Sequence, residues 1–185
     1  MFSEVHVFKA MLSIGAAGSV GRGKLGSLVG LGQGEVRTLI KRLKENDLIR
    51  IQPDGCRLSK KGEKEFTKLK EKVPWSSRVE ARSLGIGDEC AAVLVRGASH
   101  NVKKGIEQRD AAVRVGAIGA FTAFFVKGRF TIPGEGTDTE KDGPRGLWSA
   151  ARSAGPREGD VLILVGADSD ETAELGTLAA ALTLF

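Results

Sequence analysis

The chain has 185 residues, of which 41% are hydrophobic and 28% charged, so it is long enough for one large or two small globular domains, and no apolar run reaches the ~18 residues of a membrane span. Its two cysteines, Cys56 and Cys90, are too few for a disulfide framework or a metal cluster. The N-terminus also lacks the basic segment of a signal peptide, so we expect a cytoplasmic protein. The net charge of +5 divides into +7 for residues 1–73 and −2 for residues 74–185, which suggests that the first part meets a polyanion.

The first residues predict two helices joined by a glycine-rich connection. Residues 3–14 place apolar side chains on one helical stripe behind Ser3, a residue that favours N-caps. Residues 15–23 are too rich in glycine to stay helical and predict a connection. A short helix follows with Leu25, Leu28 and Val29 inward, and the glycines of residues 30–34 supply the tight turn of a helix-turn-helix.

The third predicted helix begins near Gln33 and has one apolar and one cationic face. Its aliphatic residues fall within an arc of roughly 100°, and they are Val36, Leu39, Ile40 and Leu43. The opposite face carries Arg37, Lys41 and Lys44. Like charges at this spacing repel one another slightly, and a phosphate backbone would turn that repulsion into attraction.

A hairpin and a fourth helix complete the first part. Two short runs flank Pro53-Asp54-Gly55, a sequence typical of turns. We expect these runs to point Leu48, Ile51 and Leu58 to the core and Arg50 and Arg57 to solvent. Ser59 is a good N-cap for a helix that continues to Val73. The order is helix, helix, turn, basic helix, hairpin and helix, which predicts a winged helix-turn-helix over residues 1–73.

The run "GEVRTLIKRLKENDLIRI…GCRLSKKG" resembles the winged helices of MarR- and ArsR-type regulators, and the resemblance covers roughly residues 3–72. There a recognition helix ends in leucine, several polar residues and leucine-isoleucine, and the wing is followed by Leu-Ser/Thr-x-x-Gly. The resemblance implies the fold more strongly than it implies DNA binding, since some winged helices bind only proteins.

Candidate DNA contacts follow from the predicted docking of such a helix. Base contacts are expected near the start and outward face of the recognition helix, where Gln and Arg can read base edges bidentately: Gln33, Glu35, Arg37, Thr38 and Lys41. The remaining cations are candidate phosphate contacts, which position the protein without specifying sequence: Lys24, Arg42, Lys44, Arg50, Arg57, Lys60 and Lys61. Each cation taken alone is better explained as a solvated surface residue, so the hypothesis rests on the set.

Residues 74–78 predict a domain boundary, because Pro74 disfavours helix at Val73 and the following serines are flexible. Residues 78–185 predict a mixed α/β, sandwich-like domain. Residues 90–97 and 160–167 are continuous apolar runs typical of buried strands, and residues 120–134 predict a hairpin around Lys127-Gly128. Residues 104–116 predict a helix with Ile106, Ala112 and Val113 inward, and Ser169 is expected to begin a C-terminal helix. The complete chain is therefore expected to be an α+β protein.

The second part offers no catalytic or metal constellation, and we predict neither an enzyme nor a cofactor. A polar cluster at residues 107–110 is either an ion-paired solvated face or part of an effector pocket. The pocket hypothesis uses residues that could receive a carboxylate, phosphate or amide: His100, Asn101, Gln108 and Arg109. The apolar C-terminal run, residues 178–185, is either a dimer surface or part of the domain's own core.

The segment from Asn101 to Gly134, with its Gly-Ile-Glu-Gln-Arg-Asp and Gly-Ala-x-Gly-Ala runs, and the C-terminal segment from Gly159 to Phe185 resemble an archaeal family of two-domain winged-helix proteins whose C-terminal α/β domain is uncharacterised. The family implies a two-domain regulator with no known ligand. We therefore predict a transcriptional regulator that binds double-stranded DNA as a homodimer, with residues 78–185 sensing a small-molecule effector or dimerising. The alternatives are a protein-binding winged helix in a larger complex and an enzyme with an attached winged helix. RNA binding is less favoured because the chain has two Trp and no Tyr.

Overall fold

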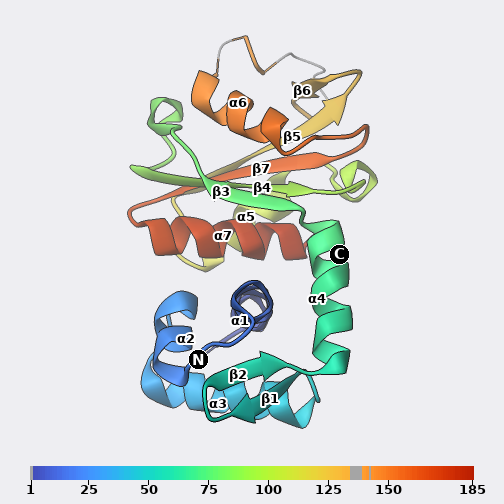
Figure 1. The fold of residues 1–185 in the computed structure, drawn as a ribbon. Helices are drawn as coiled ribbons and strands as arrows, with labels where there is room; N and C mark the ends of the chain where they lie inside the picture. Colours follow the sequence, from blue (N-terminus) through green and yellow to red (C-terminus); the bar gives the residue numbers. More distant parts are fainter. Residues whose placement is uncertain (1, 134–138, 142) are drawn as a thin grey trace. The chain divides into compact units, whose positions relative to one another are not determined.

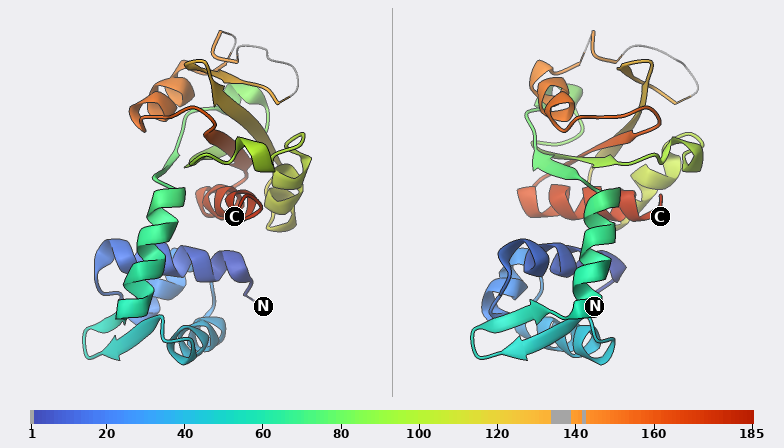
Figure 2. Two further views of the ribbon diagram at one scale, coloured as in Figure 1. Left: turned by 90° about the vertical axis from the view of Figure 1, so that its right-hand side faces the viewer. Right: turned by 45° about the vertical axis from the view of Figure 1, so that its right-hand side comes forward.

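The computed structural model describes residues 2–133, 139–141 and 143–185, and they form an α+β protein (Figures 1 and 2). The chain divides into two compact units, Met1–Glu71 and Lys72–Phe185. The first unit comprises α1 (Glu4–Ala17), α2 (Arg22–Val29), α3 (Gln33–Glu45), β1 (Ile49–Gln52), β2 (Gly55–Leu58) and α4 (Lys60–Lys72), whose last residue is the first of the second unit. The second comprises β3 (Trp75–Arg78), β4 (Glu89–Val95), α5 (Ile106–Arg114), β5 (Gly119–Val126), β6 (Arg129–Thr131), α6 (Arg145–Ser153), β7 (Val161–Ala167) and α7 (Asp170–Leu182).

In the first unit, α1, α2 and α3 enclose an aliphatic core that the hairpin β1–β2 completes. All four predicted aliphatic residues of α3 are buried, as the periodicity indicated. They pack with Met11 and Ile14 of α1, Leu25 of α2 and Ile49 of β1. The glycine-rich connection is shorter than predicted, because α1 continues to Ala17 and α2 already begins at Arg22. The order of elements is the one predicted for a winged helix-turn-helix.

The turn between α2 and α3 depends on a left-handed residue. Gly30 has φ +73°, and the N–H of Leu31 donates to the carbonyl of Gly26, so α2 ends in a close turn that starts α3 three residues later. Glycine adopts this backbone without the clash that a Cβ would introduce.

The start of α4 is fixed by Ser59, as predicted for an N-cap. Its Oγ accepts from the N–H of Gly62 at 3.0 Å and donates to the carbonyl of Asp47. The N–H of Ser59 donates to the carbonyl of Leu48 at 3.0 Å. These bonds hold the first turn of α4 against the segment that leaves α3.

This close approach predicts that alanine substitution of two helical glycines changes the free energy of unfolding in opposite directions. A Cβ on Gly62 would lie 2.0 Å from the Leu48 carbonyl oxygen, whereas a Cβ on Gly34 meets nothing within 4 Å. Both lie in the first turn of a helix, where alanine is the better helix former. We expect Gly62→Ala to lower the free energy of unfolding by about 1–3 kcal/mol and Gly34→Ala to raise it slightly. Chemical unfolding followed by far-UV circular dichroism measures both; stabilisation by both substitutions would contradict the packing described.

The second unit is built on a five-stranded antiparallel sheet with the order β3-β4-β7-β5-β6. The two central runs, β4 and β7, are paired over seven residues from Glu89↔Ala167 to Val95↔Val161. Their side chains are buried on both faces of the sheet, which explains the continuous apolar runs in the sequence. The predicted hairpin of β5 and β6 turns at Lys127 and Gly128, both with positive φ, as expected for a two-residue hairpin loop.

Helices cover both faces of this sheet: α5 and α7 lie on one face and α6 on the other (Figure 1). On the α6 side, Trp148 stacks on Phe130 with ring centroids 5.7 Å apart, and Phe121 meets Trp148 edge-on at 6.5 Å. On the other side the packing is close, since a Cβ on Gly176 of α7 would lie 2.7 Å from Val165 and 3.6 Å from Ala112.

Two expectations for the second unit are wrong. Ser76 and Ser77, predicted to be part of a flexible boundary, belong to β3, which pairs with residues 91–94 of β4 as an edge strand. In α5, Ile106 and Val113 are 49% and 45% exposed, while Ala112 and the polar Gln108 are buried. The helix therefore turns a face of small and polar residues inward, because the close approach of α7 leaves little room for large side chains.

Candidate nucleic-acid interface

A groove of about 670 Å³ lies in the first unit between the outward face of α3, the start of α2 and the hairpin β1–β2. Four cationic residues line it: Arg22, Arg37, Lys41 and Lys44. Ile40, Ile51 and Cys56 supply apolar lining, and Asp54 is the one acidic residue among the groove's lining residues. The groove therefore presents positive charge around an apolar floor, the arrangement expected for an anion that also carries apolar groups.

The cations of α3 reach this groove because of the helix period. Burial of Val36, Leu39 and Leu43 turns the opposite side of α3 outward. On that side the Lys41 side chain is 74% exposed, and its Nζ lies 3.8 Å from Oε1 of Glu45. Because an exposed ion pair of this kind is weak, the Lys41 ammonium can still bind another anion.

The hairpin is held beside α3 by contacts with the segment between α1 and α2. Val20 and Cys56 exchange two backbone hydrogen bonds, of 3.0 and 2.8 Å, and Ser19 Oγ donates to the carbonyl of Asp54 at 3.2 Å. Gly55 has φ +137°, and a Cβ there would lie 2.6 Å from the Val20 carbonyl. Only glycine fits this contact, so the groove is formed by the fold itself and needs no ligand to bring its walls together.

Two ionisable groups of the groove have shifted pKa values. Burial raises the pKa of the Cys56 thiol, so the floor stays neutral near pH 7. The hydrogen bond from Arg57, 2.5 Å from Nη2 to Oδ2, holds the pKa of the Asp54 carboxyl below its usual range. Asp54 is therefore ionised and offsets part of the charge of Arg57.

Among the predicted base contacts, Arg37 and Lys41 line the groove. Thr38 is exposed on the neighbouring surface of α3, and its hydroxyl donates to the carbonyl of Gly34 at 3.1 Å. Gln33 and Glu35 lie in the first turn of α3, outside the groove lining, with Gln33 exposed and Glu35 half-buried. The structure thus brings two of the five together in the groove and leaves the others on the adjoining helix surface.

The predicted phosphate contacts are more dispersed. Lys44 lines the groove, and Arg50 and Arg57 lie opposite each other on β1 and β2. The Arg42 guanidinium lies 5.9 Å from the centroid of the Phe2 ring, and Lys61 Nζ donates to the Asn46 carbonyl at 3.0 Å. The remaining two candidates are exposed on α2 and α4, and they are Lys24 and Lys60.

Among the groove's cationic and amide side chains, sequence reasoning missed Arg22 and Gln52. Arg22 was assigned to a glycine-rich connection, whereas it is the first residue of α2. The signal that could have revealed it is the short spacing from Arg22 to Leu25 and Val29, which already fits one helical stripe.

The proposed effector residues of the second unit do not form one cluster. Gln108 is buried and donates from Nε2 to Thr183 Oγ1 at 2.7 Å, and Asn101 donates from Nδ2 to the Leu184 carbonyl at 3.0 Å. Arg109 is exposed and pairs with Asp110 at 3.1 Å, and His100 is exposed. Gln108 and Asn101 thus hold the C-terminal segment, and Arg109 faces solvent.

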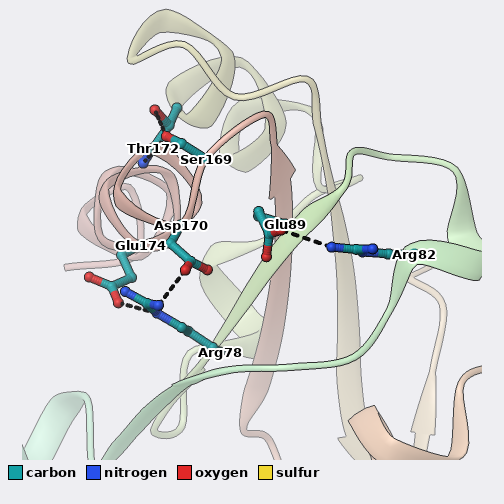
Figure 3. Close-up of polar contacts among 7 residues, drawn as sticks. All are labelled: Arg78, Arg82, Glu89, Ser169, Asp170, Thr172 and Glu174. Atoms are coloured by element: carbon teal, nitrogen blue, oxygen red, sulfur yellow. Dashed lines mark hydrogen bonds and ion pairs between the residues drawn. The ribbon is translucent and has the colours of Figure 1, made fainter.

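The second unit also contains a set of ion pairs around the start of α7 (Figure 3). Arg78 of β3 pairs with Asp170 and, at 3.0 Å, with Glu174, while Ser169 Oγ accepts from the N–H of Thr172 as the N-cap. Arg82 pairs with Glu89 at 2.8 Å. The pairs of Arg78 attach edge strand β3 to α7, and Arg82 pairs with the first residue of β4, so these contacts are better explained as structural than as a reaction site.

Within the described residues there is no group of three or more His, Cys, Asp or Glu side chains that could hold a metal ion. Over the same part of the chain, no helix has both the length and the apolar character needed to cross a membrane.

Comparison with known proteins assigns the chain to a family. A family model described as "Domain of unknown function (DUF4443)" matches residues 86–184, more than half of the chain. The chain belongs to this family. A second model, "PH0730-like, N-terminal domain", matches residues 16–64, the span that contains the groove. No curated protein sequence matches the chain.

A solved structure resembles the complete chain. "Hypothetical protein PH0730 from Pyrococcus horikoshii OT3" aligns with a TM-score of 0.82 at 23% sequence identity, covering 100% of this chain and 93% of that one. At this level of identity the likeness concerns the fold alone.

Proposed function

We propose that this protein is a transcriptional regulator whose first unit binds double-stranded DNA. The observation that carries the proposal is the cationic groove between α3 and the hairpin, in a segment whose net charge is +7. Basic charge gathered beside an exposed helix is the electrostatic footprint of a nucleic-acid-binding surface. In this proposal α3 enters the major groove, with Arg37 and Lys41 toward base edges and Lys44 toward phosphate.

The order of elements and the resemblance to MarR- and ArsR-type winged helices support duplex DNA over single strands. A single helix such as α3 contacts few base pairs, so we propose that the protein acts as a homodimer on two half-sites about 34 Å apart. The second unit would provide dimerisation, effector sensing or both. An effector would change DNA binding only if it bound the competent and incompetent forms unequally.

The salt dependence of binding tests the phosphate role of Lys44. We expect the affinity of the wild-type protein for duplex DNA to fall steeply with salt, and Lys44→Ala to reduce the slope of log K against log[salt] by about one. Fluorescence anisotropy over a salt series measures both slopes. Lys104→Ala, an exposed lysine of the second unit, is the matched control and should leave the slope unchanged.

Two outcomes would count against this proposal. Salt-independent binding would mean that the groove does not contact phosphate. An equal change of slope in Lys44→Ala and Lys104→Ala would mean that the effect reflects net charge rather than the groove.

A further inference from the structure

The hairpin carries an isoleucine whose exposure the core does not explain. Ile51 was predicted to point to the core, but its exposed fraction is 56%, compared with 2% for Ile49 on the same face of the strand. The residue opposite Ile51 is Cys56, which bridges to Val20 and packs in the core, whereas Ile51 lies outside that core cluster. Ile51 therefore faces the groove and not the core.

Among Ile40, Ile51 and Cys56 of the groove lining, Ile51 is the one whose side chain is exposed to a ligand in the groove. Around Ile51 the groove is lined by cations, and the neighbouring apolar residues Ile40 and Cys56 are buried at 8% and 3% exposure. Exposed apolar surface set among positive charges fits a ligand that alternates anionic and apolar groups. The sugar–phosphate strand of DNA has this alternation, because each phosphate is followed by a deoxyribose whose C2′ carries only hydrogen.

We propose that Ile51 packs against deoxyribose in a backbone strand held by the groove, and that this contact makes the site selective for DNA over RNA. The inference rests on the proposed function, since it assumes that the groove binds duplex DNA. A ribose at the same position would press its 2′-hydroxyl against Ile51 and the aliphatic floor, where the hydroxyl would lose its water partners. Ile51 is thus a specificity residue, and the four cations provide attraction without this discrimination.

The test uses duplex DNA carrying single ribonucleotides, because a complete RNA duplex would change the helix geometry and hide the effect. A duplex fragment bound by the wild-type protein is prepared with one ribonucleotide at each successive position. We expect binding to weaken ~10-fold at the one or two positions that face the groove, the cost of burying an unpaired hydroxyl. Affinities are measured by fluorescence anisotropy for the full chain.

Ile51→Ser is expected to remove this penalty and to weaken binding to the all-DNA duplex several-fold with no change in its salt slope, because the lost contact is apolar. Ile106→Ser replaces an isoleucine of similar exposure, 49%, in the second unit, and should behave as wild type. If DNA binds but the ribonucleotides and Ile51→Ser have no effect, the sugar contact is wrong while the proposed function stands. If wild type binds no duplex DNA, the proposed function itself fails.

Discussion

Replacing Asp160 by Ala is expected to lower the free energy of unfolding by about 3–5 kcal/mol, because removing one member of a buried ion pair leaves the other charge uncompensated. The Asp160 side chain is 2% exposed, and it accepts from Arg96 Nη1 at 2.5 Å and from the N–H groups of Gly97 and Arg157 at 2.9 and 2.8 Å. These donors lie just after β4 and just before β7, so the carboxylate joins the ends of the two central strands.

Urea unfolding followed by tryptophan fluorescence measures this effect in the second unit, since both tryptophans of the chain, Trp75 and Trp148, lie there. Asp168→Ala removes a carboxylate that is exposed and should change stability little. Equal unfolding midpoints for the Asp160 and Asp168 variants would show that the buried carboxylate does not stabilise the sheet in the way described.

Reversing the charge of Arg37 and Lys41 together is expected to weaken binding to duplex DNA by about 100-fold or more, because like charges juxtaposed across an interface cost several kcal/mol. Both side chains are exposed on α3 and line the groove, so Arg37→Glu/Lys41→Glu should leave the fold intact. Circular dichroism checks folding, and fluorescence anisotropy at physiological salt measures affinity.

The matched control reverses the same number of charges in the second unit, as Lys103→Glu/Lys104→Glu. Because the net charge changes equally, a loss of affinity confined to the α3 variant assigns binding to the groove. If the first unit instead binds a protein partner through apolar surface, the α3 variant would still bind that partner. DNA binding would then be weak, and the α3 variant and the control variant would reduce it equally.

The sequence predicts most of the first unit because its helices and hairpin obey simple periodicities, although Leu28, expected inward on α2, is 37% exposed. The aliphatic spacing of α3 defines both its buried face and its cationic face, and Ser59 marks the start of α4. The groove itself could not be predicted. Its walls are brought together by the contact of Gly55 with Val20, residues 35 apart in sequence, and no local pattern reports such a contact. Ile51 was expected in the core because the local pattern likewise does not show which surface the hairpin packs against.

In the second unit the buried strands β4 and β7 are evident as apolar runs, but α5 shows where periodicity fails. Large apolar residues were assumed to point inward, whereas the inward face is made of Gln108 and Ala112. Close packing through Gly176 selects small side chains at this contact, and a hydrophobicity pattern does not record the distance between helices. Gln108 was predicted to bind a ligand, whereas its Nε2 donates to Thr183 Oγ1 within the unit.

The measurement that tests the central claim most directly is binding of the wild-type protein to a pool of upstream DNA fragments from its own genome at physiological salt, compared with Arg37→Ala. We predict that a subset of fragments binds tightly and that Arg37→Ala reduces the preference for this subset by ~1–3 kcal/mol, the discrimination of one bidentate base contact. Weak binding that is the same for all fragments, and the same for both proteins, would contradict the assignment of the groove to sequence-specific DNA recognition.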